Sequence, residues 1–96
     1  MQRNEVLDIL ARHRPKLSAM GVASLALFGS VARNEAEGDS DVDLLVSFDR
    51  PVGFFHFLEV KDYLETVLKT RVDLVTEDAL KKQLRERILA EAVRAA

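Results

Sequence analysis

The sequence lacks several residue types and patterns, and each absence removes a class of protein. No cysteine occurs among the 96 residues, which excludes disulfides, thiolate metal sites and thiol nucleophiles together. No apolar run approaches the roughly 18 residues that would suggest a membrane helix. The amino-terminal stretch MQRNEVLDIL, which carries Glu5 and Asp8, has no apolar core of signal-peptide length. We therefore expect a cytoplasmic protein that does not enter a membrane.

A strong excess of one charge is also missing. The 14 basic and 16 acidic residues give a net charge of −2, whereas a general nucleic-acid-binding protein usually has a strong basic excess. Direct binding of nucleic acid is therefore not expected. Hydrophobic residues make up 48% of the sequence, which suits one compact domain over residues 1–96.

Apolar spacing along the chain predicts helices that alternate with short strands. Asn4 is the expected N-cap of the first helix, and Pro15 either ends this helix or begins a second helical turn. The apolar run that ends at Phe28 is typical of a strand covered on both faces. The pattern leaves open whether residues 90–96 stay helical or form an edge strand. The expected helices span 4–13, 30–34, 54–69 and the region after Thr76, and the expected strands span 24–28, 41–48 and 72–75.

Residues with chemical potential gather in one segment, LALFGSVARNEAEGDSDVDLLVSF, from Leu25 to Phe48. Gly29 and Ser30 follow its first apolar run, so the backbone amides of a helix that starts there could bind a phosphate. Asp41 and Asp43 open its second run and share one face of a strand, with about 6.6 Å of rise between them. Two carboxylates this close repel each other unless a cation lies between them. Mg²⁺ is usually held by one or two carboxylates and substrate phosphates, so the segment predicts a metal-dependent nucleotide site.

The pattern Gly29-Ser30, ten intervening residues and Asp41-Val42-Asp43 resembles the signature of the nucleotidyltransferase superfamily that includes DNA polymerase beta. Together with the stretch Arg71-Val72-Asp73-Leu74-Val75, it looks like the minimal nucleotidyltransferase group, known as the MNT partner of HEPN toxin systems. The resemblance covers nearly the whole chain. It implies an α/β fold in which helices pack mainly on one side of a small mixed sheet. It also implies two magnesium ions and transfer of a nucleoside monophosphate from a triphosphate to a hydroxyl.

The resemblance assigns roles to three carboxylates. Asp41 and Asp43 would bridge the two metal ions, while Asp73 would bind the catalytic metal and could accept the proton of the nucleophile. The structural alternatives are loop caps at Asp41 and Asp43 and a polar strand end at Asp73. We favour the functional interpretation of the pair because it leads into an apolar strand, where loop caps have no reason to recur on one face.

Three other residues are candidates for nucleotide binding, and each has a structural alternative. Gly29 could serve a tight turn, the close approach of backbone to phosphate, or both. Ser30 could be an ordinary N-cap while its neighbours' amides bind phosphate. Arg33 lies one helical turn beyond Ser30 and could bind the triphosphate bidentately. The alternative for Arg33 is a salt bridge to one of three acidic residues, Glu35, Glu37 and Asp39.

The leading hypothesis is a magnesium-dependent nucleotidyltransferase that uses ATP and modifies a hydroxyl of a partner protein. If the resemblance holds, the acceptor is a tyrosine of a HEPN ribonuclease toxin and this chain is the antitoxin. One alternative is a non-catalytic module that neutralises its partner by covering it, and another is a small-molecule nucleotidyltransferase that acts with a second subunit. The partner surface is expected on the open side of Asp41, Asp43 and Asp73, bordered by the loop from Arg50 to Phe55. The sequence leaves the oligomeric state open.

Overall fold

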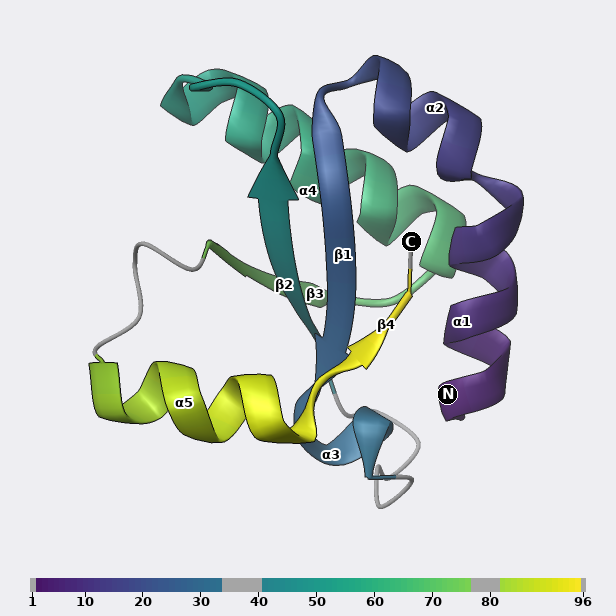
Figure 1. The fold of residues 1–96 in the computed structure, drawn as a ribbon. Coiled ribbons are helices and arrows are strands. Elements are labelled where there is room, and N and C mark those ends of the chain that lie inside the picture. Colours follow the sequence, from purple (N-terminus) through teal and green to yellow (C-terminus); the bar gives the residue numbers. More distant parts are fainter. Residues whose placement is uncertain (1, 34–40, 77–81, 96) are drawn as a thin grey trace.

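The computed structural model describes residues 2–33, 41–76 and 82–95, with the backbone alone at 82–84. The predicted helix start after Thr76 and the predicted loop over 35–40 lie outside this part of the chain. The described elements, in chain order (Figure 1), are α1 (Arg3–Arg12), α2 (Arg14–Ala19), β1 (Val22–Phe28), α3 (Gly29–Ala32), β2 (Val42–Phe48), α4 (Phe54–Leu68), β3 (Val72–Thr76), α5 (Lys82–Glu91) and β4 (Val93–Arg94).

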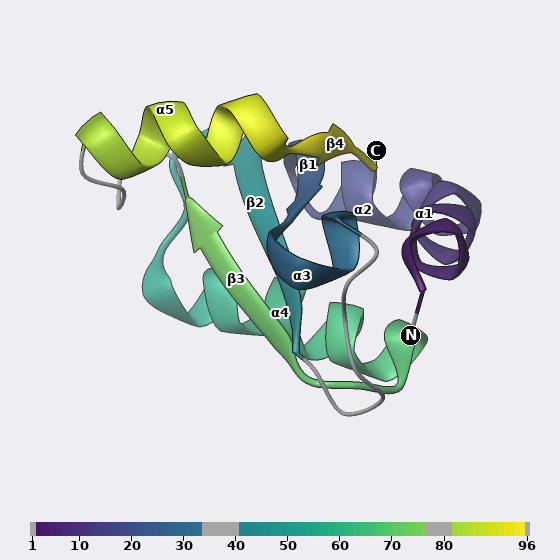
Figure 2. The same ribbon diagram turned by 90° about the horizontal axis from the view of Figure 1, so that it is seen from below.

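The strands form one mixed sheet in the order β3-β2-β1-β4. β1 pairs antiparallel with both β2 and β4, whereas β2 pairs parallel with β3. A parallel pair needs a crossover connection, which α4 provides. Helices α1, α2 and α4 lie on one face of the sheet, and α5 lies on the opposite side from α4 (Figure 2). The predicted mixed sheet with helices mainly on one side is confirmed.

The core lies between the sheet and the layer formed by α1, α2 and α4. Leu25 and Leu27 of β1 are fully buried, whereas Ala26 between them is only partly covered. The prediction of a strand covered on both faces is therefore wrong for β1, because its second face is covered only in part. Among the described residues, every buried side chain is apolar. No helix in the described ranges is long and apolar enough to cross a membrane.

The start of α1 differs from the prediction, whereas the place of Pro15 in α2 agrees with it. The N-cap of α1 is Gln2 rather than Asn4, and the backbone N–H of Gln2 donates to the Glu5 carboxylate at 3.4 Å. Glu5 lies three residues after Gln2, which is the spacing of a capping box. Pro15 stands in the first turn of α2, where its missing N–H costs nothing. The second of the two alternatives for Pro15 is therefore confirmed.

The end of the chain turns from helix to strand. α5 ends at Glu91, and β4 then pairs with β1 through Val93 and Arg94. The backbone N–H of Ala95 donates to the carbonyl of Leu25 at 2.8 Å. The alternative of an edge strand is thus confirmed for two residues of the range 90–96.

Candidate active site

The parallel pairing of β2 and β3 brings two of the predicted carboxylates together. Asp43 and Asp73 are direct partners in the register, and directly paired residues of neighbouring strands project from the same face about 4.8 Å apart. Asp41 lies just before β2, two residues from Asp43, and therefore faces the same way. The sheet thus gathers Asp41, Asp43 and Asp73 at its α3 end.

Burial and neighbouring charges shift the pKa of Asp43. Partial burial raises the pKa of Asp43 above its ordinary value, and the negative charges of Asp73 and Asp41 raise it further. The guanidinium of Arg33 acts in the opposite direction and lowers the pKa of Asp43. The deprotonated site therefore carries unfavourable negative charge, which a cation would relieve.

Arg71 supplies part of the missing positive charge. Its Nε lies 3.3 Å from Oδ1 of Asp41, and its carbonyl accepts a hydrogen bond from the backbone of Val42 at 3.0 Å. The sequence analysis gave Arg71 no role. Its position two residues before Asp73 was nevertheless a signal, because a parallel register that aligns Asp43 with Asp73 also aligns Asp41 with Arg71.

Gly29 makes room for Asp43. Its φ is +73°, a left-handed conformation that glycine adopts at little cost, so the predicted tight turn is confirmed. A Cβ atom at this position would collide with the carboxylate of Asp43, because Phe28, the preceding residue, is the strand partner of Asp43. This packing role was missed by the sequence analysis. The close approach of the Gly29 backbone to a phosphate stays a prediction.

Ser30 is not the N-cap of α3. The cap position belongs to Phe28, and α3 begins at Gly29, which makes Ser30 its second residue. The structural alternative for Ser30 is therefore wrong, because the N-cap lies two residues earlier than the serine suggested. Phosphate binding by amides near Ser30 stays a prediction.

Arg33 follows the last residue of α3 and makes a salt bridge that the sequence analysis did not consider. Its Nη1 donates to Oε2 of Glu91, at the end of α5, at 3.1 Å. The three acidic residues proposed as its alternative partners lie outside the described residues. The positive charge of Arg33 also lowers the pKa of Asp43, so Arg33 contributes to the electrostatics of the carboxylate site.

The donor chemistry of the site suits magnesium. Within the described ranges, no group of three or more histidine, cysteine, aspartate or glutamate side chains is placed to hold a metal ion by itself. Mg²⁺ rarely uses such an all-protein cage, because it usually keeps one or two carboxylates and binds substrate phosphates and water for the rest. Asp43 and its carboxylate neighbours can supply such oxygen ligands. The negative charges of Asp73 and Asp41 raise the pKa of Asp43, and a bound cation would relieve this repulsion.

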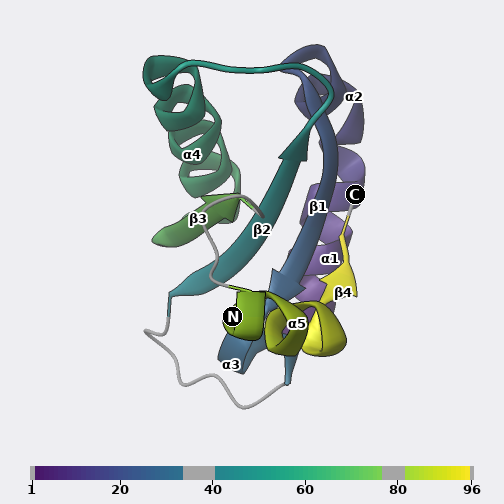
Figure 3. The same ribbon diagram turned by 60° about the vertical axis from the view of Figure 1, so that its left-hand side comes forward.

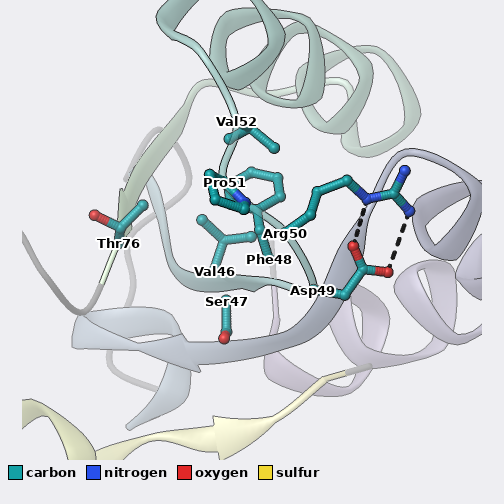
Figure 4. A pocket seen from close by; sticks show the side chains of 8 residues that line it. All are labelled: Val46, Ser47, Phe48, Asp49, Arg50, Pro51, Val52 and Thr76. Atoms are coloured by element: carbon teal, nitrogen blue, oxygen red, sulfur yellow. Dashed lines mark hydrogen bonds and ion pairs between the residues drawn. The ribbon is translucent and has the colours of Figure 1, made fainter.

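A hollow of about 680 Å³ lies at the opposite end of β2 (Figure 4). Val46, Phe48, Arg50 and Thr76 are among its lining residues, whereas the three carboxylates are not. Figure 3 shows the loop from β2 to α4 at one end of the sheet and α3 at the other. The loop from Arg50 to Phe55 therefore does not adjoin the carboxylates, because the length of β2 separates them. The partner surface that this loop was expected to border stays a prediction.

Comparisons with known proteins agree with this geometry. The nucleotidyltransferase domain family matches residues 4–95. The protein adenylyltransferase MntA of Thermococcus cleftensis is 41% identical over 90 residues, which cover 93% of this chain and 91% of that protein. A solved structure described as a minimal nucleotidyltransferase has a TM-score of 0.84 at 36% identity, with 97% of this chain and 95% of that chain covered.

A second solved structure is similar in fold. It contains a tri-AMPylated HEPN toxin of Shewanella oneidensis in complex with an MNT antitoxin. The matched chain has a TM-score of 0.61 at 17% identity, with 91% of this chain and 71% of that chain covered. Similarity at this level of identity concerns the fold alone.

Proposed function

Since the chain belongs to the nucleotidyltransferase domain family, we propose that it transfers AMP from ATP to a hydroxyl group of a partner protein. The observation that carries this proposal is the pairing of Asp43 with Asp73 on neighbouring strands, with Asp41 on the same face. The similarity to a protein adenylyltransferase over 93% of the chain supports AMP as the transferred group.

Each site residue has a role in this reaction. Asp41, Asp43 and Asp73 would hold magnesium, which when bound neutralises the triphosphate and the departing pyrophosphate. The acceptor oxygen forms a bond to the α-phosphorus while the bond from that phosphorus to pyrophosphate breaks. Asp73 accepts the proton that the hydroxyl loses, and Arg33 binds the phosphates through its guanidinium fork.

The acceptor we propose is a tyrosine of a HEPN toxin, which would make this chain an antitoxin. The complex of an AMPylated HEPN toxin with an MNT antitoxin, which shares this fold, supports that pairing. Asp41 and Asp73 are both exposed, so the carboxylate site is open to an acceptor that another protein supplies.

The test is to incubate the protein, ATP and Mg²⁺ with the protein encoded beside it and to follow the mass of both by mass spectrometry. We expect AMP on the partner and none when a chelator replaces Mg²⁺. Unmodified partner under saturating ATP would contradict the proposed reaction.

A second measurement separates modification from simple covering of the partner. Asp43→Asn should fail to silence the partner's ribonuclease activity at limiting stoichiometry, whereas Asp62→Asn, which changes an exposed aspartate on α4, should silence it fully. Full silencing by Asp43→Asn would favour the non-catalytic binding module.

A further inference from the structure

Glu91 connects the end of the chain to the candidate active site. Its Oε2 accepts a hydrogen bond from Nη1 of Arg33 at 3.1 Å, although the two residues are 58 positions apart. Both side chains are partly exposed, at 44% for Arg33 and 38% for Glu91. The contact joins α5 to the residue that follows α3.

The edge strand β4 explains how Glu91 reaches this position. Val93 pairs with Leu27, and Arg94 pairs with Ala26. Glu91 is the last residue of α5 and lies two residues before Val93. α5 and α3 are also in contact, and Figure 1 shows the junction of α5 and β4 close to α3. The pairing of β4 with β1 therefore holds the end of α5 close to α3.

The location of Glu91 is unfavourable for the helix that carries it. A carboxylate at the last residue of a helix meets the negative end of the helix dipole, and Glu91 is the last residue of α5. Its contact with Arg33 compensates for this repulsion. Helix stability alone thus gives no reason for an acidic residue at this position.

We propose that Glu91 is a positioning residue of the transfer reaction, which holds the guanidinium of Arg33 toward the carboxylate site so that it can bind the triphosphate. This inference rests on the proposed function. A guanidinium has several donors in a rigid fork, so a carboxylate can fix its orientation and a phosphate can still be bound. An unrestrained arginine would lose considerable rotamer entropy on binding phosphate, and the bond to Glu91 reduces that loss.

Glu91 could affect ATP binding in either of two opposite directions. Glu91 is negative and lies near the expected phosphates, so it could instead compete with them for Arg33. In the structure in which Arg33 is bonded to Glu91, its charge is also close enough to lower the pKa of Asp43. For this reason we expect restraint to outweigh competition.

The test uses the full chain and ATP with Mg²⁺, together with the protein encoded beside it as acceptor. We expect Glu91→Ala to raise the Kd and the KM for ATP about fivefold, the size typical of losing one partly exposed charge contact, while kcat stays within about twofold. Glu91→Asp should restore part of the affinity. Glu86→Ala removes a charge from an exposed position of the same helix and should leave Kd and KM unchanged.

Two readouts separate positioning from a structural role. The melting temperature of Glu91→Ala should stay the same or rise, because the unfavourable interaction with the helix dipole is removed. In an Arg33→Ala background, Glu91→Ala should have no further effect on ATP affinity, since it acts only through Arg33. Equal losses in both backgrounds would overturn the proposal.

The remaining outcomes are also decisive. Unchanged or tighter ATP binding by Glu91→Ala, with wild-type transfer intact, overturns the positioning role and leaves the proposed function standing. A wild-type protein that neither binds ATP nor modifies its partner overturns both. Loss of ATP affinity in Glu91→Ala that disappears in the Arg33→Ala background supports the proposal.

Discussion

The two ends of β2 hold aspartates in opposite electrostatic situations. At the α3 end, partial burial and the charges of Asp73 and Asp41 raise the pKa of Asp43. Just beyond the other end, Asp49 accepts a hydrogen bond from Arg50 at 2.6 Å, and this bond lowers the pKa of Asp49. Asp43, near the start of β2, thus has a raised pKa, whereas Asp49, just after the end of β2, has a lowered pKa because of its bond to Arg50.

This difference supports the α3 end of the sheet as the proposed cation site. A hollow of about 680 Å³ lies at the Arg50 end, but Asp49, its acidic residue, is already bonded to Arg50 (Figure 4). At the α3 end, the negative charges of Asp73 and Asp41 raise the pKa of Asp43. The proposed magnesium–nucleotide site is therefore located by its charges rather than by the size of a cavity.

The largest difference between the two ends should appear in the transfer rate. We expect Asp43→Asn to slow AMP transfer by at least about 100-fold, because a group that acts on the reacting atoms is lost, whereas Asp49→Asn should leave the rate unchanged. Initial rates of AMP incorporation, with melting temperatures to confirm folding, check this. A rate for Asp43→Asn within a few-fold of wild type would remove the basis of the comparison.

The next largest difference between the two ends of β2 should appear in how strongly ATP binding depends on Mg²⁺. We expect chelation of Mg²⁺ to weaken ATP binding by at least about tenfold in the wild type, because Asp41 and Asp43 then repel the triphosphate. Asp49→Asn should keep this dependence on Mg²⁺, and Asp43→Asn should lose most of it. Titration calorimetry with and without chelator measures the effect, and equal ATP affinity in both conditions would exclude the metal role.

A pair of glycines sharpens the comparison through stability. Gly29→Ala should lower the free energy of unfolding by about 1–3 kcal/mol, since it strains a left-handed residue and places a methyl group against Asp43. Gly53→Ala lies near the Arg50 end, where the added Cβ meets nothing within 4 Å, and should change stability by no more than about 0.5 kcal/mol. Urea unfolding measures both changes.

A second substitution tests the cause of the Gly29 effect. Asp43→Ala should recover part of the loss when it is added to Gly29→Ala, because the colliding carboxylate is gone while the backbone strain remains. If the loss stays complete, the collision contributes nothing and the left-handed conformation alone is responsible.

The smallest expected difference lies in the pH dependence of stability without metal. The folded state holds the Asp43 proton more tightly than the unfolded chain, so its contribution to stability falls as pH rises through the range just above the ordinary aspartate pKa. Asp49 has the opposite sign, and its contribution is lost as pH falls below that ordinary value. Urea unfolding of Asp43→Asn and Asp49→Asn across acidic pH should show these two slopes removed separately.

Local features of the sequence predicted most of the helices and strands and two features of the site. The alternation that begins β2 places Asp41 and Asp43 on one face, and Gly29 occupies the left-handed turn that its sequence context indicated. The errors at Asn4 and Ser30 were shifts of two residues in the N-cap, which is the usual uncertainty of a helix end.

Contacts between distant segments were the part that the sequence left open. Arg33 was considered only against nearby acidic residues, whereas its partner Glu91 arrives through the pairing of β4 with β1. The loop from Arg50 to Phe55 was expected to border the partner surface around the carboxylates. A seven-residue strand, whose ends are roughly 20 Å apart at about 3.3 Å per residue, lies between this loop and the carboxylates.

By itself, the sequence determined β1, β2 and β3, the turn at Gly29 and the shared face of Asp41 and Asp43, because steric preference and apolar alternation act over a few residues. Only the tertiary structure decided that Arg71 meets Asp41, that Glu91 meets Arg33 and that Gly29 must leave space for Asp43. These contacts depend on which strand edges pair and in which register. That choice is made by burial of the whole core rather than by any one segment.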